Sequence, residues 1–151
     1  MSINKFLASD IQITYCPKLK ISQMPIIRTA HDAYKIVYHR WDKGKLQFIE
    51  QFKVMFLNRG SRLLGIYEVS SGGISGTVAD PKVIFIAALK CCATSIILVH
   101  NHPSGNLQIS KPDERLTKKI RDAGKLLDIE VLDHLIITNE GYSSLAEEGM
   151  L

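Results

Sequence analysis

Disulfide-forming cysteine patterns and membrane-length apolar runs are both absent from this sequence of 151 residues. Its three cysteines, two of them adjacent at Cys91 and Cys92, form no disulfide framework and suit a reducing compartment. No apolar run approaches the roughly 20 residues that a membrane-spanning helix needs, and the opening MSINKFLASD lacks the layout of a signal peptide. We therefore expect a cytoplasmic protein with no membrane contact.

Internal repeats, low-complexity tracts and linkers are also missing, which favours one globular unit. At 46% hydrophobic residues, the chain is long enough to bury one core. Weak alternation and two prolines in the first 25 residues predict an extended arm, so we expect an arm over 1–28 and a domain over 29–151. A net charge of +4 permits contact with nucleic acid or an acidic protein without requiring either.

Hydrophobic periodicity and capping residues predict alternating helices and strands in the domain. The expected elements are a helix over 29–41, strands over 46–57 and 62–69, a helix over 81–92, a strand over 95–99, a helix over 110–127, a strand over 131–138 and a short helix over 143–151. A Gly-rich connection at 70–77 follows the hairpin of the first two strands. This order predicts an α/β fold, a mixed sheet with helices on both faces.

The stretch 95-SIILVHNHPSGNLQISKPDE-114 contains the main candidate site. Because alternate residues of an extended chain point the same way, His100 and His102 can present two imidazoles to one point. Ser110 and Asp113 form an S-x-x-D capping pattern, which can serve only to start a helix. A first-turn carboxylate can also face back to the histidines, and two histidines with one carboxylate are a ligand set of catalytic zinc centres. The residues favour the metal site over the cap alone.

Other motifs with similar letters do not fit. The chain lacks the H-x-E and P-C-x-x-C patterns of zinc deaminases and the H-E-x-x-H pattern of other metalloproteases. The string His-Asn-His is not an HNH nuclease motif, whose letters lie far apart in sequence. Neither 60-GSRLLG-65 nor 70-SSGGISG-76 is a phosphate-binding loop, since no G-K-[ST] follows.

A hydrolytic metal site also needs a general base, usually a carboxylate outside the ligand set. Alternation over the predicted strand 46–57 places Glu50 as the single charge on a face with Phe48, Phe52, Val54 and Phe56. Burial on such a face would raise the pKa of the carboxyl toward that of a useful base. Glu68 in the next predicted strand is the rival candidate, and the pattern favours Glu50.

The residues H-x-H-P-x6-S-x2-D, from His100 to Asp113, resemble the JAMM motif of MPN-type metalloproteases. More narrowly, residues 46–151 resemble the RadC family through 50-EQFKVMFLNRGSRLLG-65, 96-IILVHNHPSGN-106 and 123-AGKLLDIEVLDHLIIT-138. The resemblance implies a cytidine-deaminase-like three-layer α/β/α sandwich that holds one catalytic Zn²⁺.

By the same resemblance, His100, His102 and Asp113 are the metal ligands, Glu50 is the general acid and base, and Ser110 is the hydrogen-bond donor to the transition state. The implied reaction is hydrolysis of a peptide or isopeptide bond in a protein or peptide substrate. The family's traditional description gives an alternative, a DNA repair or recombination accessory protein whose metal is structural. An inactive MPN-type interaction module is a third alternative, which the intact motif disfavours.

Two further features are interpreted from the residues alone. His134 lies in an apolar predicted strand, where a histidine is more often a hydrogen-bonded core residue than a ligand. The predicted helix 111–127 is rich in Lys and Arg, which are usually solvated but could contact DNA phosphates or an acidic partner.

Overall fold

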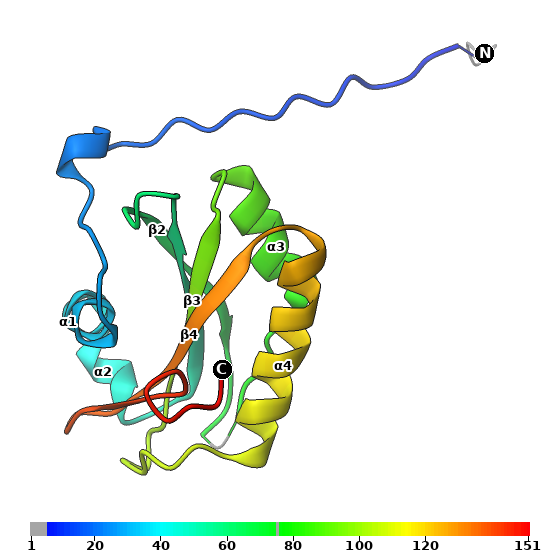
Figure 1. Ribbon diagram of the computed structural model, residues 1–151. Helices are drawn as coiled ribbons and strands as arrows, with labels where there is room; N and C mark the ends of the chain where they lie inside the picture. Colours follow the sequence, from blue (N-terminus) through cyan, green and yellow to red (C-terminus); the bar gives the residue numbers. More distant parts are fainter. Residues whose placement is uncertain (1–5, 75) are drawn as a thin grey trace.

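A five-stranded mixed sheet forms the centre of the molecule, with the strand order β2-β1-β3-β4-β5 (Figure 1). The computed structural model describes residues 6–74 and 76–151, so residues 1–5 of the expected arm and Ser75 of the Gly-rich connection lie outside the described residues. The strands are β1 (Gln51–Leu57), β2 (Leu63–Ser71), β3 (Ser95–Asn101), β4 (Glu130–Ile137) and β5 (Tyr142–Ser144). Among the strand pairs of the described residues, only β3–β4 is parallel.

Helices cover both faces of this sheet. On one face lie α1 (Ala30–Arg40) and the short α2 (Lys43–Leu46), and on the other lie α3 (Pro81–Lys90) and α4 (Lys111–Leu126) (Figure 1). Each face has its own apolar core, because residues of opposite parity in β1 and β3 point to opposite sides. The expected α/β architecture, a mixed sheet between helical layers, is confirmed.

The strand that was expected over 46–57 is shorter than predicted. It begins at Gln51, because α2 and a turn occupy the preceding residues. Phe48 is consequently 61% exposed and does not share the apolar face with Phe52. The alternation argument therefore holds from residue 50 onward and was wrong for the residues before it.

The helix expected over 143–151 is also wrong. β5 extends the sheet from Tyr142 to Ser144, and turns follow it over residues 145–149. The Ser144 hydroxyl donates to the buried Asp133 carboxylate at 2.5 Å, and the Ala146 N–H donates to the same carboxylate at 3.0 Å. These bonds hold the segment against β4, whose edge would otherwise have no partner.

Before α1, the described chain contains a short 3-10 helix, η1 (Ile21–Gln23), and from about residue 20 back to residue 6 it is extended, with its first described residues projecting from the body (Figure 1). It meets the sheet at an antiparallel bridge between Ile26 and Arg62, beside the start of β2. The Arg62 guanidinium also donates to the Met24 carbonyl at 2.9 Å. Within the described residues, no helix combines the length and the apolar character that crossing a membrane requires.

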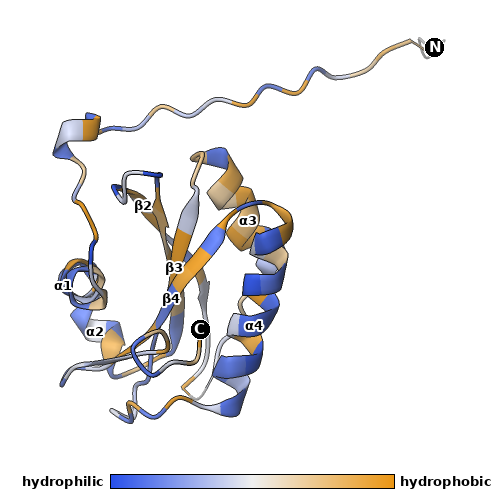
Figure 2. Ribbon diagram, in the orientation of Figure 1, coloured by the Kyte–Doolittle hydropathy of each residue, from blue (hydrophilic) through white to orange (hydrophobic). Residues whose placement is uncertain are grey.

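The helix α4 positions the candidate site and is docked tightly at its far end. Its outward surface is mainly hydrophilic, whereas α3 and the central strands are mainly hydrophobic (Figure 2). Near the carboxyl end, Gly124 lies so close to the following turn that an added Cβ would be 2.3 Å from the Ile129 carbonyl oxygen. That contact is far below van der Waals distance and leaves no space for a side chain.

Gly124→Ala is therefore expected to lower the free energy of unfolding by about 1–3 kcal/mol through overpacking, although alanine has the higher helix propensity. Gly65→Ala is the control, since its added Cβ meets no described heavy atom within 4 Å. Urea denaturation of both variants measures the difference. Equal stability of the two variants would contradict the close docking of α4.

Candidate metal centre

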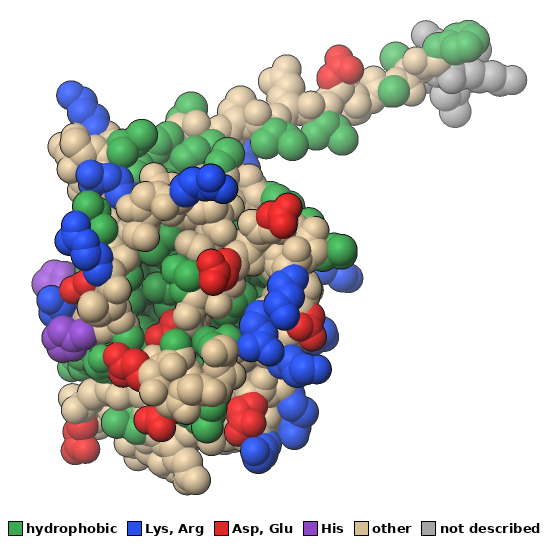
Figure 3. Space-filling model, in the orientation of Figure 1, with side chains coloured by type: hydrophobic (Ala, Val, Ile, Leu, Met, Phe, Trp, Pro, Cys, Tyr) green, Lys and Arg blue, Asp and Glu red, His purple; other side chains and the backbone are tan. Residues whose placement is uncertain are grey.

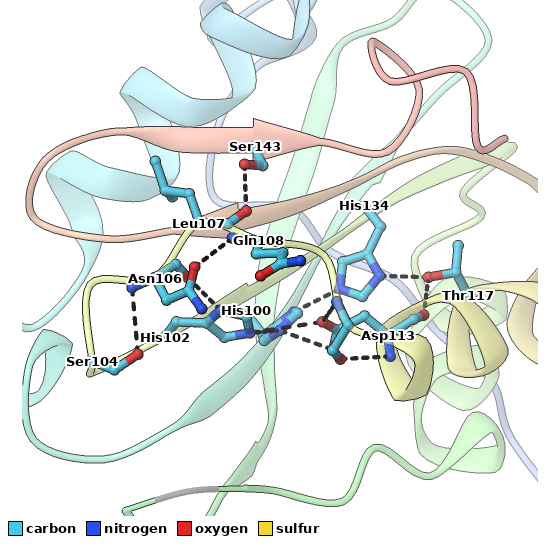
Figure 4. Close-up of polar contacts among 11 residues, drawn as sticks. His100, His102, Ser104, Asn106, Leu107, Gln108, Asp113, Thr117, His134 and Ser143 are labelled. Carbon is cyan, nitrogen blue, oxygen red and sulfur yellow. Dashed lines mark hydrogen bonds and ion pairs between the residues drawn. The ribbon is translucent and has the colours of Figure 1, made fainter.

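Three side chains converge at the end of β3 and the start of α4 (Figure 4). The His100 Nε2 is 2.9 Å from the His102 Nε2 and 3.2 Å from an Asp113 carboxylate oxygen, while His102 Nε2 is 3.8 Å from the other oxygen. The three potential ligand atoms, one from each residue, all lie within 4.8 Å of one another. The sequence-predicted ligand set is thus assembled in space.

Local structure explains the convergence. His100 belongs to β3, and the His102 N–H bonds the Ile137 carbonyl at 3.1 Å, which extends the pairing with β4 past the strand end. At the start of α4, Ser110 is the N-cap and forms a capping box with Asp113. The Ser110 N–H donates to one Asp113 carboxylate oxygen at 2.9 Å, so the other oxygen is turned to His100. The cap and the cluster therefore use the same carboxylate.

The donor atoms suit a small divalent cation. Ligands of a tetrahedral zinc ion at 2.0–2.1 Å lie about 3.3 Å apart, and the contacts of the His100 Nε2, 2.9 Å to His102 and 3.2 Å to Asp113, are close to that spacing. The His102 Nδ1 is 2.6 Å from the Asn106 carbonyl oxygen, which can only accept, so the ring proton is on Nδ1. This bond leaves a lone pair on the His102 Nε2, directed into the cluster.

Asp113 is poised to remain ionised. Burial acts to raise the pKa of its carboxyl, but the adjacent His100 ring and the hydrogen bonds from Ser110 outweigh it. The net effect holds the pKa of Asp113 far below its usual range. The site therefore contributes a fixed negative charge that a cation would neutralise.

Behind His100 lies a second layer of buried polar side chains (Figure 4). Its Nδ1 is 2.7 Å from the Nε2 of His134, whose Nδ1 is 2.6 Å from the Thr117 hydroxyl. His134 is fully buried, and this burial lowers its pKa well below the usual value. His134 is thus a hydrogen-bonded core residue, as the sequence pattern predicted, and its partner is a candidate ligand.

Asn101 lies between the two histidines in sequence, and its side chain points to the opposite side of β3. There it forms hydrogen bonds with the segment that contains Glu50. Its side-chain amide donates to the carbonyls of Leu46 and Ile49 at 2.8 and 2.9 Å. Its carbonyl oxygen accepts from the Gln51 N–H at 2.7 Å. The histidine strand and the Glu50 segment are therefore bound to each other by one fully buried side chain.

Glu50 and Ser110 share a cleft with the three candidate ligands. The cleft has a volume of about 980 Å³ and lies between the segment around Gly76 and Thr77 and the loop from His102 to Ser110. Glu50 is half-buried, and its backbone pairs with Gly72 and Gly73. The structure thus brings together all five residues that the sequence singled out.

The rival base, Glu68, is engaged elsewhere. It accepts a 2.6 Å hydrogen bond from Gln51 and lies 3.9 Å from the Lys53 ammonium, on the side of the sheet that packs against α1. Since Gln51 and Lys53 have the opposite parity to Phe52 in β1, their side chains point away from the cleft. The geometry favours Glu50 over Glu68.

Two contributors to the site were missed from the sequence. Thr117 lies one helical turn after Asp113, and this i, i+4 spacing could have placed it beside the candidate ligand. Asn101 could have been assigned to the opposite face by alternation, but its three backbone partners lie about fifty residues upstream. No local pattern predicts such distant partners.

Comparison with known proteins identifies the family of this chain. The model of the RadC-like JAB domain matches residues 27–150. A UPF0758 protein of Flavobacterium johnsoniae is 46% identical over 101 residues, which are 67% of this chain and 44% of the relative. A UPF0758 protein of Methanosarcina mazei is 36% identical over 135 residues, 89% of this chain and 55% of the relative.

The chain spans about half the length of the curated relatives it matches. Within that span, the family model covers the sheet, the helices on both faces and all five residues of the candidate site. The chain belongs to the RadC-like JAB domain family.

Proposed function

We propose that this chain is a zinc-dependent hydrolase that cleaves a peptide or isopeptide bond in a protein or peptide substrate. One observation carries the proposal: His100, His102 and Asp113 form a metal-sized cluster in an open cleft that Glu50 and Ser110 also line. A bound zinc ion would supply Lewis-acid activation of water and of the scissile carbonyl. The two imidazoles and the carboxylate would hold the ion and leave a coordination position facing the cleft.

The other two residues would handle the proton and the developing charge. Glu50 would accept the proton of the attacking water and pass it to the leaving amine, which requires no further acid in the cleft. The Ser110 hydroxyl accepts from the Asp113 N–H at 3.2 Å, so its own hydrogen is available for donation. That hydrogen would stabilise the oxyanion of the substrate carbonyl.

The test uses the purified chain loaded with zinc and incubated with a proteome-derived peptide library and with isopeptide-linked peptides. Mass spectrometry then counts new amino termini against a matched sample stripped of metal with a chelator. We expect cleavage only with zinc. A folded, zinc-loaded chain that cleaves neither substrate class would contradict the proposal.

A second candidate function, contact with DNA, is favoured by the charge on α4. Exposed cations recur at the i, i+4, i+7 and i+8 spacing of one helical face, and Lys and Arg side chains gather over this helix in Figure 3. The residues of this face are Lys111, Arg115, Lys118 and Lys119. Glu114 neutralises part of the charge through its ion pair with Lys111.

If three of these cations meet phosphates, the affinity for a short DNA duplex should fall about 40-fold between 50 and 200 mM salt. The double variant R115E/K119E should weaken binding and flatten this salt dependence. Charge reversal at Lys82 and Lys90 on α3 is the control. Fluorescence anisotropy measures all three proteins, and equal salt slopes would rule out this face of α4 as the contact.

A further inference from the structure

A buried chain of polar contacts connects the backbone of α4 to the candidate ligand His100. The Thr117 hydroxyl is 2.6 Å from the Asp113 carbonyl oxygen and 2.6 Å from the His134 Nδ1, and the His134 Nε2 is 2.7 Å from the His100 Nδ1. All three side chains are buried, with exposed fractions between 0% and 2%. With water excluded, each contact must be satisfied within the chain.

The direction of the first bond is fixed by the carbonyl, which can only accept. Thr117 must donate its single hydroxyl hydrogen to the Asp113 carbonyl oxygen, because two unprotonated oxygens at 2.6 Å would repel each other. The hydroxyl can then only accept from His134. The proton of the neutral His134 ring is therefore on Nδ1.

The proton on the His134 Nδ1 also fixes the direction of the hydrogen bond between His134 and His100. With its proton on Nδ1, the His134 Nε2 carries a lone pair and must accept from His100. The His100 Nδ1 is therefore protonated, so in the neutral ring the Nε2 carries a lone pair that faces His102 and Asp113. His102 has the same tautomer, because its Nδ1 donates to the Asn106 carbonyl oxygen.

We propose that Thr117 and His134 are positioning residues that hold His100 in its Nδ1-protonated tautomer and thereby keep its Nε2 open to a metal ion. The proposal deepens the zinc site on which the proposed function rests. Two Nε2 lone pairs only 2.9 Å apart repel each other, and a cation between them relieves the repulsion. These hydrogen bonds thus fix the tautomer that metal binding requires in the metal-free protein.

Removal of the Thr117 hydroxyl should reverse the direction of the hydrogen bond between His134 and His100. Without an acceptor at Nδ1, His134 would move its proton to Nε2 and donate to His100, since a buried N–H without a partner is costly. The His100 proton would then move to Nε2, where the Asp113 carboxylate, 3.2 Å away, would accept it. Metal binding would have to displace that proton.

The test compares Thr117→Val, which has nearly the same shape but no hydroxyl, with Thr117→Ser, which keeps the hydroxyl. Competition with a chromophoric chelator measures zinc affinity, and we expect a loss of about 10- to 100-fold in T117V and near wild-type affinity in T117S. Thr117→Ala is measured beside them in case valine prevents folding. A T117V protein that folds and binds zinc as tightly as T117S would overturn the proposal.

Nitrogen NMR of the metal-free proteins gives a readout that packing alone would not change. In the wild type and in T117S, the His100 Nε2 should have the shift of an unprotonated ring nitrogen, and in T117V that of a protonated one. An Nε2-protonated His100 in the wild type would refute the inference. A wild type with the expected tautomer but no zinc affinity would refute the proposed function instead.

Discussion

Glu50→Gln is expected to lower peptide-bond hydrolysis by about 100- to 10,000-fold, the usual contribution of a general base. Glutamine keeps the size of the side chain and its place in the cleft, but it cannot accept a proton from water. Because Glu50 is not a member of the ligand cluster, zinc content should remain that of the wild type. Activity and bound zinc are measured on the same preparation.

Glu68→Gln is the matched control for Glu50→Gln. It removes one carboxylate from a neighbouring strand, on the side of the sheet away from the cleft, where Gln51 and Lys53 are its partners. Its activity should stay within a few-fold of the wild type. If E50Q cleaves as fast as E68Q, Glu50 has no part in the proton transfer.

Asp113→Asn should weaken zinc binding by at least about 100-fold, beyond the usual effect of an outer-layer residue. Asparagine can still accept the Ser110 N–H through its amide oxygen, and the N-cap Ser110 is unchanged, so α4 should keep its start. What is lost is the charge of a carboxylate whose pKa lies far below its usual range and which is therefore ionised at neutral pH. Metal affinity should fall with little change in helical circular dichroism.

Glu114→Gln is the control for this variant, because it removes the next carboxylate along the same turn. Glu114 forms an ion pair with the exposed Lys111 instead of facing the histidines. Zinc affinity in E114Q should match that of the wild type. Equal losses in D113N and E114Q would indicate a general charge effect and contradict the assignment of Asp113 as a ligand.

Much of the architecture followed from local patterns. The capping pairs at Thr29 and Ser110 and the Asp80-Pro81 start marked three helices within a residue or two. The apolar run that ends at His100 was a central strand, buried throughout. These features are encoded within a few residues, so a pattern can reveal them.

The errors in the fold occurred where distant contacts decide the structure. The segment 46–50 has alternating apolar residues, yet Asn101 holds the carbonyls of Leu46 and Ile49 in a turn. The terminal segment favours a helix by composition, but the Asp133 carboxylate and the open edge of β4 make Tyr142–Ser144 a strand. Tertiary contacts override propensity in both places.

The candidate site shows the same division. The convergence of His100, His102 and Asp113 could be predicted, because the alternation of an extended chain and a helix cap specify where their side chains point. The choice between Glu50 and Glu68 needed the pairing of β1 with β2 and β3, which decides the side on which each carboxylate lies. The bonds from Thr117 through His134 join α4, β4 and β3, and only the folded chain brings these elements together.

The zinc content of the purified chain tests the central claim most directly. Elemental analysis after reconstitution with zinc and removal of excess metal should give one zinc ion per chain, with less than about one tenth of that in a D113N sample treated identically. A well-folded wild-type chain that retains no zinc would contradict the account, because His100, His102 and Asp113 would then form a cluster without a metal.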